Sequence, residues 1–139
     1  MKNATELVWD GNGSAIATSG ALVLSAGASS GWNPVALLVT AAGVSLFNAF
    51  MELTRAADVP ILGYVSQQRA DVDARGNVRE LSVMASISVP SYEAALRAQT
   101  VWTLAVRDAP VLRTLACPIS CEPCIVVLSE YETRLERRA

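Results

Sequence analysis

One long uncharged segment limits the folds that this chain can adopt. No charged residue occurs between Asp10 and Glu52, and the second half of that segment is almost continuously apolar. Asn33 and Pro34 stand where the apolar run begins; Asn is a favoured N-cap, and Pro fits the first position of a helix. We therefore predict one long helix over residues 33–53, preceded by a region too rich in Gly and Ser to belong to it.

The predicted helix has no clearly polar face, which indicates burial on several sides. Helical spacing suggests one packing face, which consists of Leu38, Ala41, Ala42, Ser45 and Ala49. A membrane-spanning helix needs about 20 predominantly apolar residues. The apolar run over residues 35–51 is shorter than this and contains Thr40 and Asn48. We therefore expect a helix inside a protein core or interface, and no membrane partner.

The composition points to a large buried surface and excludes several classes of function. Hydrophobic residues make up 52% of the chain, and charged residues 17%, against about 25% in an average domain. The net charge of −2 gives no electrostatic basis for binding nucleic acid. The chain contains no histidine, so a Ser-His or Cys-His catalytic pair within one chain is excluded.

The element pattern predicts an α+β fold in a single domain, residues 1–139, with frayed tails at 1–4 and 130–139. Before the long helix we predict a short strand at residues 5–10, and one or two more over residues 14–18 and 21–25. After it we predict strands at 61–71 and 78–89, a hairpin loop at 73–77 between them, and a last strand at 124–128. Ser91 is the predicted N-cap of a second helix, and Asp108 that of a short third one.

Residues 78–89 carry the clearest strand pattern of the chain. Every second side chain is apolar, at Leu81, Val83, Ala85, Ile87 and Val89. Polar residues occupy most of the positions between them, namely Glu80, Ser82, Ser86 and Ser88. This alternation predicts a sheet with one covered face and one face open to solvent.

Three cysteines cluster near the end of the sequence, at Cys117, Cys121 and Cys124. Their spacing matches the iron–sulfur motif of radical S-adenosylmethionine enzymes, but those enzymes place it early in a much longer barrel. A zinc site would need a fourth ligand, such as Glu122 or a residue of a partner chain. The Cys-x-x-Cys spacing of the last two also suits redox chemistry, although buried cysteines without chemistry are common. These interpretations stay open, and no cofactor or metal is assigned.

The N-terminal residues and the cysteine count both bear on location. Residues 1–6 contain acidic and polar residues in place of an apolar signal segment. An odd number of clustered cysteines is not typical of a secreted disulfide framework. We therefore expect a cytoplasmic protein.

Two segments resemble signatures of the OsmC/Ohr family, the osmotically inducible and organic hydroperoxide resistance proteins. The long helix starts with Asn-Pro-Val-Ala-Leu-Leu and continues through small residues to Ser45. It is similar to the family's Ser-Pro-x-x-Leu-Leu segment, which leads to a cysteine. Residues 108–115, Asp-Ala-Pro-Val-Leu-Arg-Thr-Leu, are similar to the second signature, Cys-Pro-Val-Ser-x-x-Leu. The chain length and the order of elements agree as well, and the resemblance covers about residues 20–128.

The resemblance implies an OsmC-like fold, with antiparallel sheets around the buried central helix and two chains intertwined as a homodimer. It also implies a peroxidatic and a resolving thiol, at the positions that Ser45 and Ala109 occupy here. Serine cannot form a sulfenic acid and alanine cannot form a disulfide, so we predict both positions to be inactive in peroxide reduction. As a buried helical serine, Ser45 is expected to bond back to the carbonyl four residues earlier.

We therefore predict an OsmC/Ohr-like dimeric scaffold with an apolar pocket for a small ligand, and with Trp32 and Arg113 as candidate pocket residues. One alternative is a hydroperoxide reductase or thiol redox protein that uses the displaced cysteines. Another is metal binding by the same cysteine cluster. The expected ligand is a small apolar compound, or a hydroperoxide in the enzymatic alternative, and whether the chain is an enzyme stays open.

Overall fold

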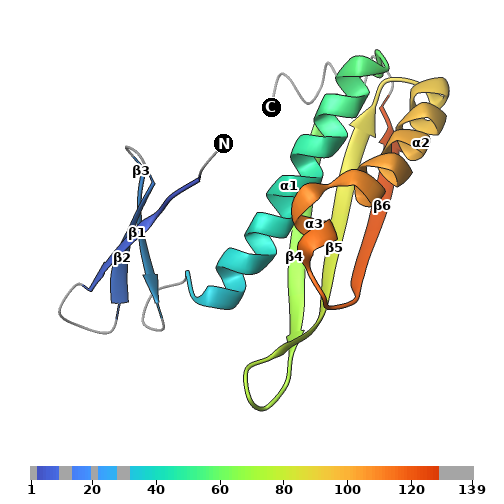
Figure 1. Ribbon diagram of the computed structural model, residues 1–139. Coiled ribbons are helices and arrows are strands. Elements are labelled where there is room, and N and C mark those ends of the chain that lie inside the picture. The colour runs from blue at the N-terminus through green and yellow to red at the C-terminus, as the bar shows by residue number, and fades with distance from the viewer. Residues whose placement is uncertain (1–2, 10–13, 20–21, 28–31, 129–139) are drawn as a thin grey trace. The chain divides into compact units, whose positions relative to one another are not determined.

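The computed structural model describes residues 3–9, 14–19, 22–27 and 32–128 of the chain (Figure 1). The chain forms two compact units, Met1–Thr40 and Ala41–Ala139, and the boundary between them falls within the long helix. Each unit is described by itself below. The frayed tail expected at residues 130–139 lies outside the described residues, and the prediction of a single domain stays a prediction.

The first unit contains an antiparallel sheet of three strands in sequence order. Its strands are β1 (Glu6–Trp9), β2 (Ser14–Ser19) and β3 (Leu22–Gly27). Val8 pairs with Ile16, and Thr18 pairs with Val23, so the register places three large apolar side chains, Val8, Ile16 and Val23, on the same face. The strand predicted at 5–10 is confirmed, and the one or two strands predicted over 14–18 and 21–25 are two, with small shifts of their ends.

The long helix α1 (Pro34–Ala56) begins at the predicted cap and runs slightly beyond the predicted end. The Asn33 side chain accepts a hydrogen bond of 2.9 Å from the Ala36 amide, which satisfies one of the free amides of the first turn. Asp58 follows the helix with a φ of 58°, the left-handed conformation in which helices commonly end. The Arg97 guanidinium donates to backbone carbonyls at this end, including that of Asp58 at 3.5 Å.

The second unit is built on a mixed sheet with strand order β4-β5-β6. Strands β4 (Gly63–Val72) and β5 (Val78–Val89) form an antiparallel hairpin, whereas β6 (Ile119–Val127) runs parallel to β5. Two helices, α2 (Tyr92–Asp108) and α3 (Pro110–Thr114), make the crossover that parallel strands require (Figure 1).

The expectation of antiparallel sheets is therefore wrong for the last strand. Its predicted range, 124–128, was also too short at its start, because Pro118, Glu122 and Pro123 are typical of a loop. Strand β6 lies at the edge of the sheet, where a proline removes no hydrogen bond that a neighbouring strand needs.

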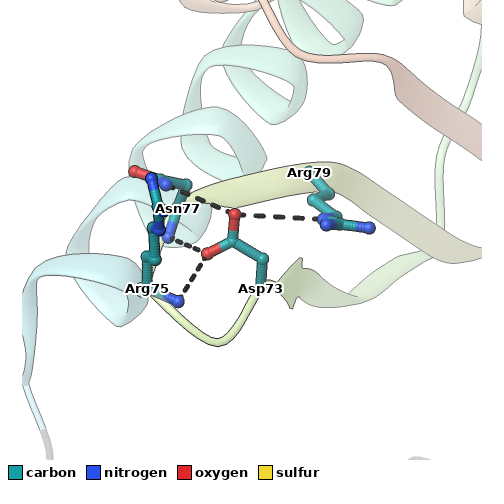
Figure 2. A network of polar contacts seen from close by, with 4 residues as sticks. All are labelled: Asp73, Arg75, Asn77 and Arg79. Atoms are coloured by element: carbon teal, nitrogen blue, oxygen red, sulfur yellow. Dashed lines mark hydrogen bonds and ion pairs between the residues drawn. The ribbon is translucent and has the colours of Figure 1, made fainter.

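Asp73 organises the hairpin loop between β4 and β5, which the sequence places at residues 73–77. Its carboxylate accepts hydrogen bonds of 2.9 Å from the backbone amides of Arg75 and Asn77, and one of 3.3 Å from the Asn77 side chain (Figure 2). The backbone hydrogen bond from Asn77 is the main reason that the pKa of Asp73 is lowered. Gly76 has a φ of +86°, which glycine adopts without strain. The predicted loop is confirmed.

The core of the second unit lies between one face of the sheet and the helices. The alternating side chains of β5 are buried as predicted, at Leu81, Val83, Ala85, Ile87 and Val89. Helix α2 begins at the predicted cap, Ser91, whose hydroxyl accepts a 3.1 Å hydrogen bond from the Ala94 amide. Phe50 of α1 joins the layers, since its ring centroid lies 5.8 Å from that of Tyr64 on β4 and 5.7 Å from that of Trp102 on α2.

Helix α1 buries a different face from the one that its sequence suggests. The buried residues are Ala42, Gly43, Leu46, Phe50 and Thr54, whereas Ala41, Ser45 and Ala49 of the predicted face are not fully buried. An apolar helix without a polar face has no pattern that fixes its rotation. The rotation depends on shape, because Gly43 accommodates the Gln68 side chain and Phe50 fits between two aromatic rings.

Helix α1 is, among the residues that the structure describes, the one helix long and apolar enough to cross a membrane by length and composition. Its most apolar window has a mean hydropathy of 1.8, and 33% of that window is buried. The core helix of a protein that never enters a membrane can have the same length and composition. Leu46 and Phe50 of this helix are completely buried.

We predict that Gly43→Ala destabilises the protein by about 1 kcal/mol through overpacking. A Cβ at this position would lie 2.6 Å from the Gln68 side-chain carbonyl carbon and amide nitrogen. In a Gln68→Ala background the clash disappears, and the same change becomes stabilising by up to about 1 kcal/mol, because Ala is the better helix former. Urea unfolding of the four proteins measures both effects.

Gly63→Ala is the control for this cycle, since a Cβ there would meet Ser88 at 3.5 Å, an ordinary contact. An effect of Gly43→Ala with the same sign and size in both backgrounds would show that the Gln68 contact does not position the helix.

Candidate functional site

Ser45 of α1 and the start of α3 form the centre of the candidate site. The Ser45 hydroxyl oxygen accepts a hydrogen bond of 3.1 Å from the Val111 amide. Ala109 is the N-cap residue of α3, is fully buried, and has no side chain that could cap the helix. The two positions that the family resemblance assigns to thiols are therefore brought to the same place.

Through this hydrogen bond Ser45 caps α3, a role that the sequence of α1 alone does not predict. The sequence favoured a bond from Ser45 back to the carbonyl of Ala41, whereas the structure pairs its oxygen with Val111, 66 residues away. Val111 lies in the first turn of α3, where backbone amides have no partner within the helix. Ser45 thus caps α3 from a different element. Asp108, the predicted cap, pairs instead with its neighbour Arg107.

An open groove runs along α1 beside this contact and has a volume of about 740 Å³, within the usual range for ligand sites. Its long side is one face of the helix, at Ala41, Val44, Ser45, Asn48, Ala49, Glu52, Leu53 and Ala56. Its other side is the junction of α2 and α3, at Asp108, Pro110 and Val111. The sequence did not identify Asn48 and Glu52 as candidate site residues. Their spacing of three and seven residues from Ser45 nevertheless places them on its side of the helix.

The groove has two charged lining residues, Asp108 and Glu52, and only Asp108 is held in an ion pair. Asp108 is held by Arg107, with the guanidinium nitrogen 2.9 Å from the carboxylate oxygen. This hydrogen-bonded pair lowers the pKa of Asp108, and the positive charge of Arg113 on α3 lowers it further. Arg113 is exposed and is not among the lining residues of the groove, so it acts on this site through its charge. Glu52 is exposed to solvent on α1.

The cysteines do not converge on one point within the chain. Cys121 pairs with the buried Val83 in the sheet, and Cys124 pairs with the exposed Ser86, so the two thiols lie on opposite faces. Cys117 precedes β6 and is half-buried. Among the described residues, no three Cys, Asp or Glu side chains are placed to hold a metal ion.

Cys121 lies on the covered face of the sheet and influences Tyr64 of β4. Burial raises the pKa of the Cys121 thiol, and burial also raises the pKa of the nearby Tyr64 hydroxyl. That hydroxyl is buried, and the nearby Ser66 side chain lowers its pKa in part although the two make no hydrogen bond of normal geometry. A thiol with a raised pKa is protonated at neutral pH, which makes it a weak nucleophile.

Trp32 belongs to the first unit, where it lies just before α1 and is exposed. Its assignment to a pocket stays a prediction, as no residue of the first unit lines the groove along α1.

We predict that Ser45→Ala destabilises the protein by about 1 kcal/mol, since the Val111 amide loses its partner. Ser86→Ala is the control, because that serine is exposed on the other face of the sheet, where a substitution changes stability by about 0.5 kcal/mol or less. Urea unfolding measures both, and hydrogen exchange of the Val111 amide reports the local effect. Equal stability of the two variants would contradict the capping role.

Solved structures are similar to this chain over most of its length. An OsmC-like protein from Mycoplasma pneumoniae has a TM-score of 0.80 and 15% identity, over 91% of this chain and 98% of that one. An OsmC-like protein of unknown function from Vibrio cholerae has a TM-score of 0.76 and 10% identity, over 89% and 99%. The organic hydroperoxide resistance protein OhrB of Bacillus subtilis has a TM-score of 0.64 and 14% identity, over 91% and 98%. No protein-family model and no curated protein sequence matches the chain.

These similarities concern architecture, since one fold can support several functions. They agree with the two sequence signatures in the order and type of elements along nearly the whole chain. The chain has the fold of the OsmC-like and organic hydroperoxide resistance proteins.

Proposed function

We propose that this protein is a divergent member of the OsmC/Ohr group that has lost the peroxidase site and binds a small, mostly apolar ligand in the groove along α1. The group includes proteins described as organic hydroperoxide resistance proteins. In this chain the groove lies beside Ser45, at the position that the resemblance assigns to the peroxidatic thiol.

One observation carries the proposal. The Ser45 hydroxyl oxygen accepts a 3.1 Å hydrogen bond from the Val111 amide of α3, and Ala109 is buried at the start of that short helix. Peroxide reduction needs a thiolate that attacks the peroxide oxygen and becomes a sulfenic acid, which a second thiol then resolves. Neither step is available to a hydroxyl and a methyl group. A serine nucleophile would need a general base, and the chain has no histidine.

The three cysteines give less support to the alternative proposal, a thiol-dependent redox enzyme. Cys121 and Cys124 would have to form a disulfide for Cys-x-x-Cys redox chemistry, but they lie on opposite faces of β6. Burial raises the pKa of Cys121 and so disfavours the thiolate that attacks peroxides. A metal site would require cysteines from more than one chain, because those of one chain do not converge.

A homodimer is the second part of the proposal, and the first unit supplies its support. Both faces of its sheet carry exposed apolar side chains: Leu7 on one face is 68% exposed, and Val8, Ile16 and Val23 on the other are 52%, 41% and 70% exposed. None of the residues of this unit whose exposure is described is buried. A sheet of three strands needs a covered apolar face to be stable. A second copy of the chain supplies that cover, and the high apolar content of the sequence fits such an interface.

We predict no thiol-dependent turnover of an organic hydroperoxide by the native protein with a dithiol as reductant. The assay follows loss of cumene hydroperoxide, with the Cys117→Ser/Cys121→Ser/Cys124→Ser variant in parallel. Turnover by the native chain that disappears in this variant would establish the displaced-thiol alternative. Turnover that persists in it would show a peroxidase site that uses no cysteine, and would also contradict the proposal.

We predict a particle of twice the 14.7 kDa chain mass in sedimentation equilibrium. Val23→Asp should weaken this dimer by at least tenfold, because it places a charge in the proposed interface. Val65→Asp is the matched control: Val65 is 69% exposed, much like Val23 at 70%, but it lies on the sheet of the second unit. A monomeric native protein, or a dimer weakened by the control alone, would refute this interface.

A further inference from the structure

The sheet of the second unit has a hollow of about 310 Å³ on its open face, the face that points away from the helices. Two adjacent rows of outward side chains line this hollow. One row consists of Gln67, Met84 and Glu122, and the other of Val65, Ser86 and Cys124. A second copy of the chain that packs against α1 approaches the sheet from the helix side, so this hollow stays open in such a dimer.

Met84 interrupts the polar pattern of the open face. Between Glu80 and Ser88 every other outward position of β5 is a serine, whereas Met84 is 56% exposed. An apolar side chain gains little hydrophobic stabilisation where it stays exposed. The thioether sulfur of methionine is, however, a ligand for soft metal ions. The position of Met84 on this face therefore suits metal binding better than packing.

Cys124 brings a second sulfur to the same hollow. It pairs with Ser86 in parallel register, which places it diagonally from Met84 on the neighbouring strand. Adjacent strands lie about 4.8 Å apart, and diagonal neighbours are within reach of a long, flexible side chain such as methionine. Cys124 is a free cysteine and is exposed. The hollow thus combines an accessible thiol with a thioether, although the three cysteines of the chain do not converge.

The charges around the hollow favour a cation. Glu122 lines it, is exposed, and stands opposite Met84 in the register of β5 and β6. Arg69 lies in the next row of the same face, where Asp71 and Glu80 line a second hollow with it. These carboxylates outnumber the one guanidinium, so the charge of the two hollows together is negative and attracts cations.

We propose that Cys124 and Met84 bind a soft monovalent metal ion, Cu(I), on the open face of the sheet. Thiolate and thioether ligands select Cu(I), which is stable with few ligands. The Cys124 thiol loses its proton to solvent as its bond to the metal forms, and the Met84 sulfur donates a lone pair. A structural zinc site usually has four nitrogen, sulfur or carboxylate ligands, which this hollow does not supply. The site is independent of the groove along α1.

The test observes the methionine methyl groups of the full-length protein by NMR. The protein is titrated with Ag(I), a redox-stable analogue of Cu(I), and in parallel with Zn(II). We expect Ag(I) to shift the methyl signal of Met84 and to leave that of Met51 on α1 unchanged. Zn(II) should shift neither signal, because a thioether is a poor ligand for it. Competition with bicinchoninate in the absence of oxygen measures the affinity for Cu(I).

Met84→Leu and Cys124→Ser should each weaken Cu(I) binding by about tenfold or more, because loss of a ligand costs at least as much as loss of an outer-shell partner. Both residues are exposed and both changes nearly keep the side-chain size, so we expect the fold to persist. The matched controls are Met51→Leu and the double variant Cys117→Ser/Cys121→Ser. Each control should leave the affinity of the site within about twofold.

Several results would overturn the proposal. Cu(I) binding that persists in Cys124→Ser, or that is lost in Cys117→Ser/Cys121→Ser, would place the metal at another site. An unshifted Met84 methyl, or an unchanged affinity of Met84→Leu, would show that the thioether is not a ligand. A shift of Met84 with Zn(II) as large as that with Ag(I) would contradict the selectivity for a soft ion.

Discussion

The packing of α1 on the sheet of the second unit determines where the site can form. Phe50 packs between Tyr64 and Trp102, with ring centroids 5.8 Å and 5.7 Å away, and Gly43 allows the helix to approach the sheet closely. When these residues face the sheet, Ser45 turns to the side on which α3 begins. The hydrogen bond to α3 and the groove beside it both follow from this one rotation of the helix.

Ser45 and Ala109 lie at the contact between α1 and α3. At the position that the resemblance assigns to a peroxidatic thiol, the Ser45 oxygen accepts a hydrogen bond from the Val111 amide and holds the start of α3. At the neighbouring position, Ala109 fills space and is fully buried. A hydrogen bond makes the contact between the helices, and neither a serine hydroxyl nor an alanine methyl can carry thiol redox chemistry at these two positions. The groove beside this contact is lined by small and apolar side chains and by the carboxylates of Glu52 and Asp108.

Short sequence patterns predicted the helix caps and the buried face of β5, because both depend on neighbouring residues of the chain. Asn33 and Ser91 cap their helices as expected, because a side-chain oxygen near a free amide needs no distant partner. The alternation along β5 identified its buried face, since an antiparallel pair with one covered side enforces that period. The start of β6 was missed because Pro123 resembles a loop residue, and its tolerance depends on lying at a sheet edge.

The sequence by itself determined the cap and length of α1, the covered face of β5, and the absence of thiols at positions 45 and 109. These are properties of residue type and of periods of two or about four residues. Only the tertiary structure decided which side of an all-apolar helix is buried, that Ser45 bonds to Val111, and that Cys121 and Cys124 lie on opposite faces of a parallel strand. Each of these depends on contacts between distant segments, and no local pattern records how a helix is rotated or which strand lies beside another.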